Sequence, residues 1–135
     1  MVRSIYCDTA AQHKNPVPNA AMHRGLLVTS GILGKDPKTD QYFDDIEQQF
    51  SSVFSQLEAI MSQAGGTVQD VVKVDLYMAN KQNRPLANRY WEKLWPDPQQ
   101  RPARQAHQAD LPPGCVVQIV ATAVLDPLRP AQATP

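Results

Sequence analysis

The sequence has no excess of charge of either sign and no long apolar run, and each absence excludes a class of protein. Thirteen Lys and Arg residues balance 13 Asp and Glu residues, so the chain as a whole has no positive field to attract nucleic acid or an anionic membrane. No stretch approaches about 18 apolar residues, and the segment Met1–Cys7 lacks the apolar core of a signal peptide. We therefore expect a cytoplasmic protein that binds neither nucleic acid nor membrane.

Cysteine is also scarce, since Cys7 and Cys115 are the only two and lie far apart in the sequence. A secreted disulfide scaffold would need more, which favours a reduced, intracellular compartment. No Cys or His residues occur at the short spacing of metal ligands, and no glycine-rich phosphate loop or dinucleotide-binding fingerprint is found. The sequence therefore predicts no metal site and indicates no nucleotide cofactor.

The length of 135 residues and the hydrophobic content of 42% fit a single globular domain. We expect this domain to span residues 1–126. The tail 127–135 is rich in Pro and Ala and is expected to fray. The segment Thr9–Asn19 contains two prolines and is expected to form a loop.

Two stretches show the apolar periodicity of a helix that packs on one side. The first runs from Asp44 to Ala64, and the double glycine 65–66 after it supplies a left-handed stop. The second runs from Arg84 to Trp95 and is followed by two prolines that would end it.

Four further segments are predicted to be strands: Leu26–Ser30, Val71–Met78, Ala103–Gln108 and Val116–Leu125. Residues 3–7 could add an edge strand. The last of the four is apolar on nearly both faces, so we expect helices to cover one face and a second subunit the other. The order of elements predicts an α+β fold with two helices on one face of the sheet.

Arg104 is the most unusual residue of the predicted strands. It lies among small side chains, and the strand Ala103–Gln108 offers it no carboxylate partner. A buried guanidinium without a partner is costly, and its planar fork suits a bidentate carboxylate ligand. The alternative is a structural ion pair with Asp75 or Asp110. The residues alone leave both interpretations open.

Other candidates have weaker support. Ser30 and Gly31 end a strand where backbone N–H groups could approach a ligand. Asn88, near the inner side of the second helix, could bond a loop or a ligand. Gln118 lies within an apolar strand, where its amide must be satisfied in an interface or by a held water. His107 alternates with Arg104 and should face the opposite way.

Several short segments occur together in an order and spacing typical of one family: Gly25–Gly31, Asp36–Thr39, Ala64–Gly66, Asp70–Asp75, Asn88, Pro102–Arg104 and Leu111–Pro112. From about residue 15 to 126 the sequence thus resembles the RidA family, also called the YjgF or L-PSP endoribonuclease family. The resemblance implies a chorismate-mutase-like α+β fold. It also implies a homotrimer with clefts between subunits.

The same resemblance implies an activity. Family members of the best-known type hydrolyse reactive 2-imino or 2-enamino acids to a 2-keto acid and ammonia, with no metal or organic cofactor. By this likeness the partner is a small carboxylated metabolite, and Arg104 holds its carboxylate. The backbone of Ser30 and Gly31 would help to hold it, and Asn88 would lie in or near the cleft.

Two positions depart from the family's active pattern. Gln118 stands where the deaminases place a Glu that positions or activates water, and Val17 stands where they place a Tyr. An amide can orient water but cannot accept its proton. The alternatives are thus a 2-iminobutanoate/2-iminopropanoate deaminase-like enzyme using Arg104 and Gln118, and a non-catalytic protein that binds keto acids in the cleft. A ribonuclease is disfavoured by the zero net charge and the lack of a catalytic His pair.

Overall fold

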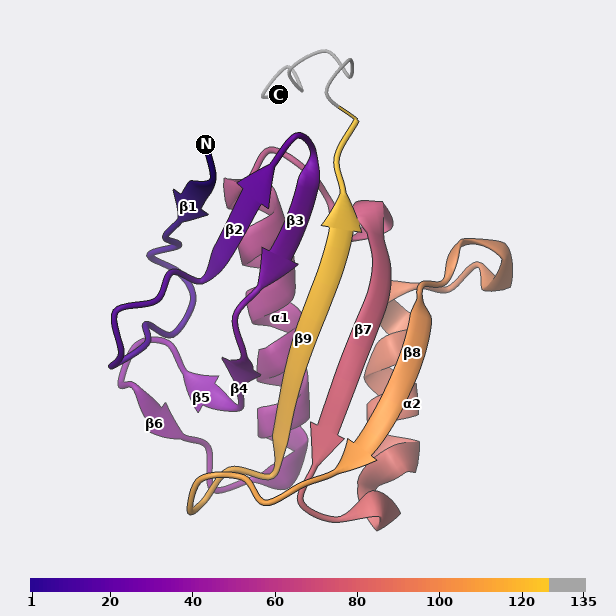
Figure 1. Cartoon of the computed structure of the whole chain (residues 1–135). Coiled ribbons are helices and arrows are strands. Elements are labelled where there is room, and N and C mark those ends of the chain that lie inside the picture. The colour runs from indigo at the N-terminus through magenta and orange to yellow at the C-terminus, as the bar shows by residue number, and fades with distance from the viewer. Residues whose placement is uncertain (127–135) are drawn as a thin grey trace.

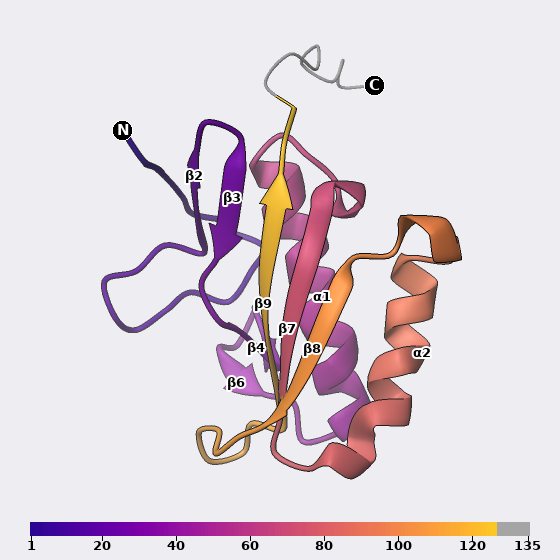
Figure 2. The ribbon, with the colours of Figure 1, turned by 45° about the vertical axis from the view of Figure 1, so that its right-hand side comes forward.

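The chain forms a mixed sheet with both α-helices on one face. The computed structural model describes residues 1–126, and its main sheet has the strand order β1-β2-β3-β9-β7-β8, with β4 also paired to β9 (Figure 1). Figure 2 shows α1 and α2 on the same side of this sheet. The other face, which we call the open face, has no covering element within residues 1–126. This arrangement confirms the predicted α+β class; the tail 127–135 lies outside the described residues.

The elements have the following bounds. The α-helices are α1 (Ile46–Gln63) and α2 (Arg84–Leu94), and short 3-10 turns span Val68–Asp70, Lys81–Asn83 and Pro98–Gln100. The main sheet contains β1 (Arg3–Ile5), β2 (Ala20–His23), β3 (Leu26–Thr29), β4 (Ile32–Leu33), β7 (Val71–Met78), β8 (Ala103–Gln108) and β9 (Val117–Val124). A separate small sheet pairs β5 (Lys35–Asp36) with β6 (Gln41–Tyr42).

Every predicted helix and strand is present, but the sequence did not predict β2, β4, β5 or β6. The segment β2 has no strong strand-forming pattern and depends on its pairing with β3. Arg24 and Gly25 join the two strands with φ angles of 51° and 84°. Positive φ at both positions is the requirement of a tight two-residue hairpin, and it explains why a glycine is found there.

Helix α1 begins and ends at identifiable signals. The Asp45 side chain accepts a hydrogen bond from the Glu47 backbone N–H, and Gly65 leaves the helix with φ of 89°. Its apolar stripe is fully buried against the sheet, as are the inward residues of the two central strands: Phe50, Val53, Leu57, Ile60, Val74, Leu76, Val117 and Ile119. Burying this stripe is the main driving force that fixes α1 on the sheet.

Beside the apolar stripe, α1 carries a second buried stripe that is polar. Gln49, Ser52 and Gln56 are 1%, 7% and 3% exposed. Gln49 Nε2 donates to the carbonyls of Phe43 and Gly114, both at 2.7 Å, while its Oε1 accepts from Val116 N at 2.9 Å. Gln49 therefore satisfies backbone groups of two segments that belong to no strand.

Replacing Gln49 by Ala should destabilise the protein strongly, because it leaves three backbone groups without a partner. Each such buried group costs about 1–3 kcal/mol, so we expect the unfolding free energy to fall by about 3–5 kcal/mol. Urea denaturation measures this. The matched control is Gln48→Ala, an exposed glutamine of the same helix, which should change stability by less than about 0.5 kcal/mol. Equal losses in the two variants would contradict the role of Gln49.

Candidate functional site

Arg104 lies on edge strand β8 with its side chain directed toward α2. Its Cα pairs with that of the buried Val74, so both residues face the helix side of the sheet. Arg104 Nη2 donates to Asn88 Oδ1 at 2.8 Å, and the guanidinium carbon lies 5.0 Å from the centre of the Trp91 ring. The ring and the amide thus fix the orientation of a half-buried guanidinium.

The ion-pair alternative for Arg104 is wrong. Asp75 is bound instead to Lys73 at 3.5 Å and to His107 at 3.4 Å. Within residues 1–126, neither Asp110 nor any other carboxylate lies within ion-pair distance of Arg104. Burial, and secondly the charge of Arg84, lowers the pKa of the Arg104 guanidinium. An arginine still remains charged at neutral pH, so the site holds an uncompensated positive charge.

A second cluster joins the strand junction at Ser30–Gly31 to Gln118. The two residues interrupt the edge that β3 and β4 present to β9. A Cβ atom at Gly31 would lie 2.9 Å from Gln118 Cδ, so the absence of a side chain is what leaves room for the Gln118 amide. Ser30 Oγ donates to Pro18 O at 2.7 Å, which brings the early loop with Val17, 40% exposed, to the same junction.

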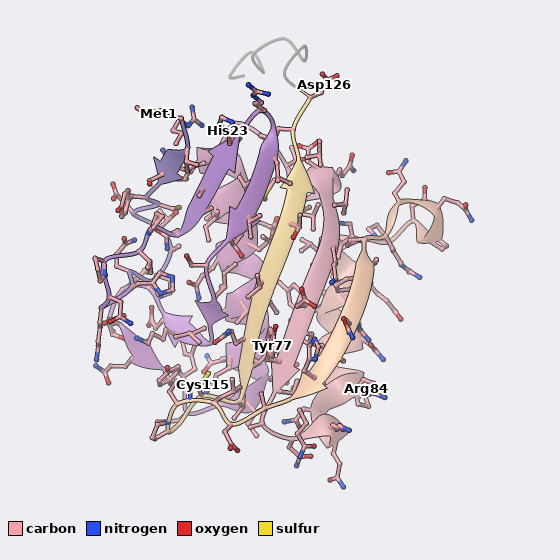
Figure 3. The ribbon with its side chains drawn as sticks, viewed as in Figure 1. Met1, His23, Tyr77, Arg84, Cys115 and Asp126 are labelled. Carbon is pink, nitrogen blue, oxygen red and sulfur yellow. The ribbon has the colours of Figure 1, made fainter. Side chains whose placement is uncertain are left out.

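The two clusters lie on opposite faces of the sheet. Gln118 stands between the fully buried Val117 and Ile119, so it faces away from the helices. Its Cα partner on β7 is Tyr77, which Figure 3 shows on the open face. Strand β7 also separates β8 from β9. A single chain therefore cannot bring Arg104 and Gln118 to the same small ligand.

His107 faces opposite to Arg104, as predicted. Its ring stacks on Tyr77 with centroids 4.8 Å apart, and its Nε2 lies 3.4 Å from Asp75 Oδ1. Lys73 approaches the same carboxylate. The open face thus carries a partly buried cluster of His107, Asp75 and Tyr77. Exposed apolar residues lie on the same face, and four of them are 42–52% exposed: Leu26, Val28, Val72 and Val124.

Comparisons with known proteins identify the family of the chain. The family described as Endoribonuclease L-PSP matches residues 9–125. The chain is a member of the RidA/YjgF family. It is 27% identical to a RutC family protein from Aquifex aeolicus, over 91% of this chain and 99% of that protein. It is 26% identical to the 2-iminobutanoate/2-iminopropanoate deaminase of Salmonella typhimurium, over 92% of this chain and 98% of that protein.

Solved structures extend the similarity to the fold of this RidA/YjgF member. The Rid-family protein YyfA from Yersinia pestis, described as of unknown function, superposes with a TM-score of 0.86 at 27% identity. The match covers 93% of this chain and all of that one. Within residues 1–126, no helix is long and apolar enough to cross a membrane.

The sequence of this RidA/YjgF member did not predict one group of polar residues that could bind a ligand. Lys35, His13 and Tyr42 line a cavity beneath the early loop, and Lys35 has a side chain only 10% exposed. A lysine between Gly34 and Asp36 reads as a solvated turn residue, so no local signal marks its burial. The polar stripe of α1 had a signal, since Gln49, Ser52 and Gln56 share helical spacing.

Proposed function

We propose that this protein is a deaminase that hydrolyses the C=N bond of reactive 2-imino acids and their enamine tautomers. The products are a 2-keto acid and ammonia. The observation that carries the proposal is the charged Arg104 guanidinium, fixed by Asn88 and Trp91, with no carboxylate partner within residues 1–126. The deaminase name of the Salmonella relative supports the same chemistry.

In the proposed complex Arg104 binds the substrate carboxylate. Only one of its five N–H donors is taken by Asn88, so a bidentate pair with a carboxylate remains available. The Trp91 ring lies against the guanidinium and limits the directions from which water can solvate it. Holding the carboxylate leaves the adjacent imine carbon in a fixed position, which is the contribution of orientation to the rate.

Hydrolysis then needs one water molecule. Its oxygen adds to the imine carbon while a proton goes to the nitrogen, and the resulting carbinolamine expels ammonia as the C=O bond forms. Gln118 orients the attacking water through its amide oxygen but cannot take the proton. The proton therefore passes to solvent or to the substrate nitrogen, and the expected rate is lower than with a carboxylate at this position.

We further propose that the site forms between copies of the chain in a homotrimer. The Arg104–Asn88 side of one copy would meet the Ser30–Gly31–Gln118 junction of the next, because one chain holds these groups on opposite faces. The apolar open face supports this assembly, since exposed Leu26, Val28 and Val124 suit burial against another subunit. A head-to-tail contact of this kind would form a closed trimer where each copy is rotated by a third of a turn from the last.

A second candidate function is the binding of keto acids or related carboxylates without catalysis. Gln118 favours it, because the position has no acid to activate water, and so does Val17, which offers no hydroxyl to the cleft. Titration with 2-oxobutyrate would show saturable binding under either function. Only the deaminase would also accelerate imine hydrolysis.

The first prediction of the proposal concerns Arg104→Ala. With freshly generated 2-aminoacrylate, we expect kcat/KM for pyruvate and ammonia release to fall by about 10- to 150-fold. This ratio corresponds to the free energy of a hydrogen bond between charged groups. Arg89→Ala is the control, since Arg89 lies on α2 next to Asn88, is exposed and, among residues 1–126, forms its ion pair with Glu47 rather than with the site. Equal rates for wild type and Arg104→Ala would refute the proposed carboxylate contact.

The second prediction concerns Gln118→Glu. A carboxylate that faces the attacking water should raise kcat by at least about tenfold, because it adds general-base help. The variant's rate should also fall as the pH drops through the pKa of the new Glu, a limb that the wild type lacks. Gln105→Glu adds the same charge at an exposed position of β8 and should change neither quantity. An unchanged kcat with a flat pH profile would place Gln118 away from the reacting water.

The third prediction tests whether the site is shared between copies. Arg104→Ala and Gly31→Leu should each keep at most about a tenth of wild-type activity, the second because its side chain displaces Gln118. Co-refolding the two variants in equal amounts should restore about a quarter of wild-type activity, since random mixing pairs two intact halves at that frequency. No recovery in mixed oligomers, verified by light scattering, would show that one chain supplies the whole site.

A further inference from the structure

A cavity separate from the Arg104 site lies beneath the early loop. It has a volume of about 400 Å³, within the usual range for small-molecule sites. We call it the Lys35 pocket, and its defining residues are His13, Lys14, Ile32, Leu33, Lys35 and Pro112. Arg104, Asn88 and Gln118 do not line it, although Gly31 lies on its wall.

The charged side chains in the wall of the Lys35 pocket are two lysines, Lys14 and Lys35, and of the residues described there none is Asp or Glu. The pKa of His13 is lowered, first by burial and then by the charge of Lys35, which favours the neutral imidazole. Burial raises the pKa of Tyr42, a neutral phenol whose ring centre lies 5.3 Å from Lys35 Nζ. The lysine charge, with neutral N–H and O–H donors beside it, favours an anion.

The Lys35 ammonium is weakly satisfied for a side chain that is 10% exposed. Within residues 1–126 its one ion-pair partner is Asp40, at 3.4 Å, and the Asp40 side chain is 47% exposed. A bond of that length is weak, and a solvated carboxylate is a loosely held partner. Donor capacity on Lys35 therefore remains for a ligand.

The walls of the pocket are held in place by other hydrogen bonds. Gln56 Oε1 accepts from Ala11 N at 3.0 Å, and Asn19 Nδ2 donates to Ala11 O at the same distance, which fixes the early loop over the cavity. Gln56 Nε2 also donates to Leu33 O at 2.8 Å. The pocket is thus preformed, and a ligand need not order the loop.

We propose that the Lys35 pocket binds a small organic carboxylate with an apolar body. The carboxylate lies at Lys35 Nζ, and the Tyr42 hydroxyl and His13 are within the same cavity. The side chains of Ile32, Leu33 and Pro112 face the apolar body. This site does not depend on the proposed deaminase function, since no residue of its charged group belongs to the Arg104 cluster.

Benzoate is a suitable probe, and benzamide is its neutral counterpart of the same shape. In an NMR titration of the wild-type protein, benzoate should shift the amide signals of residues 11–15 and the methyl signals of Ile32 and Ile60 saturably, with Kd in the millimolar range or tighter. Benzamide should not. Saturable shifts of equal size with both compounds, or none with benzoate, would overturn the proposal.

Variants of single charged residues test whether Lys35 supplies the charge that binds benzoate. Lys35→Met should weaken benzoate binding by about 10-fold or more, while Lys38→Met, at an exposed position of the same hairpin, should not. Asp40→Asn removes the competing carboxylate and should tighten binding by about two- to fivefold. This variant keeps Lys35, so it tests the proposal even where Lys35→Met fails to fold.

Arg104→Ala separates this site from the proposed reaction site. It should leave the benzoate-induced shifts of residues 11–15 unchanged while lowering the deaminase activity by the 10- to 150-fold expected above. Benzoate binding that is lost in Arg104→Ala, or that is unaffected by both Lys35→Met and Asp40→Asn, would overturn the Lys35 pocket without touching the deaminase proposal. Intact Lys35-dependent binding in a protein without deaminase activity would overturn the deaminase proposal and leave the Lys35 pocket unaffected.

Discussion

The interaction on which the rest of this structure depends is the hydrogen bonding of two buried glutamines on α1 to the irregular backbone around them. Gln49 links the segment before α1 to the loop before β9, and Gln56 links β4 to the early loop. A loop that packs against a core must have its N–H and C=O groups paired, and water cannot reach them there. Each glutamine, with two donors and one carbonyl, satisfies several such groups at once.

This constraint explains why the candidate sites lie where they do. The Ser30–Gly31 junction passes directly into β4, whose Leu33 carbonyl is held by Gln56, so the junction is tied to the helix and cannot drift along β9. The same glutamine fixes Ala11 in the loop over the Lys35 pocket. Both the proposed reaction site and the pocket are therefore positioned by one rigid element, which gives loop residues the precision that loops alone lack.

Sequence patterns predicted the elements whose own residues specify them. The apolar stripe of α1 fits only a helix, and the alternation in Val71–Met78 fits only a strand. Both elements were found with nearly the predicted bounds. The strand β2 was missed because Ala20–His23 has little strand preference and is set by its hairpin turn and its partner. For Arg104 the sequence indicated only that it and His107 face opposite ways. Its contacts with Asn88 and Trp91 depend on how α2 packs on the sheet.

The topology also connects the residue type at position 118, a Gln where the family resemblance implies a Glu, to assembly. Because Arg104 and Gln118 occupy opposite faces, carboxylate binding and water positioning would come from different copies in the proposed trimer. Relative to the acid that the family resemblance implies at this position, an amide would change the chemistry at one half of the site and leave the carboxylate-binding half intact. An amide would also place no charge on a face that the proposed trimer buries, where an unpaired carboxylate would be costly. Gln118 would therefore favour assembly and substrate capture at the expense of the proton-transfer step.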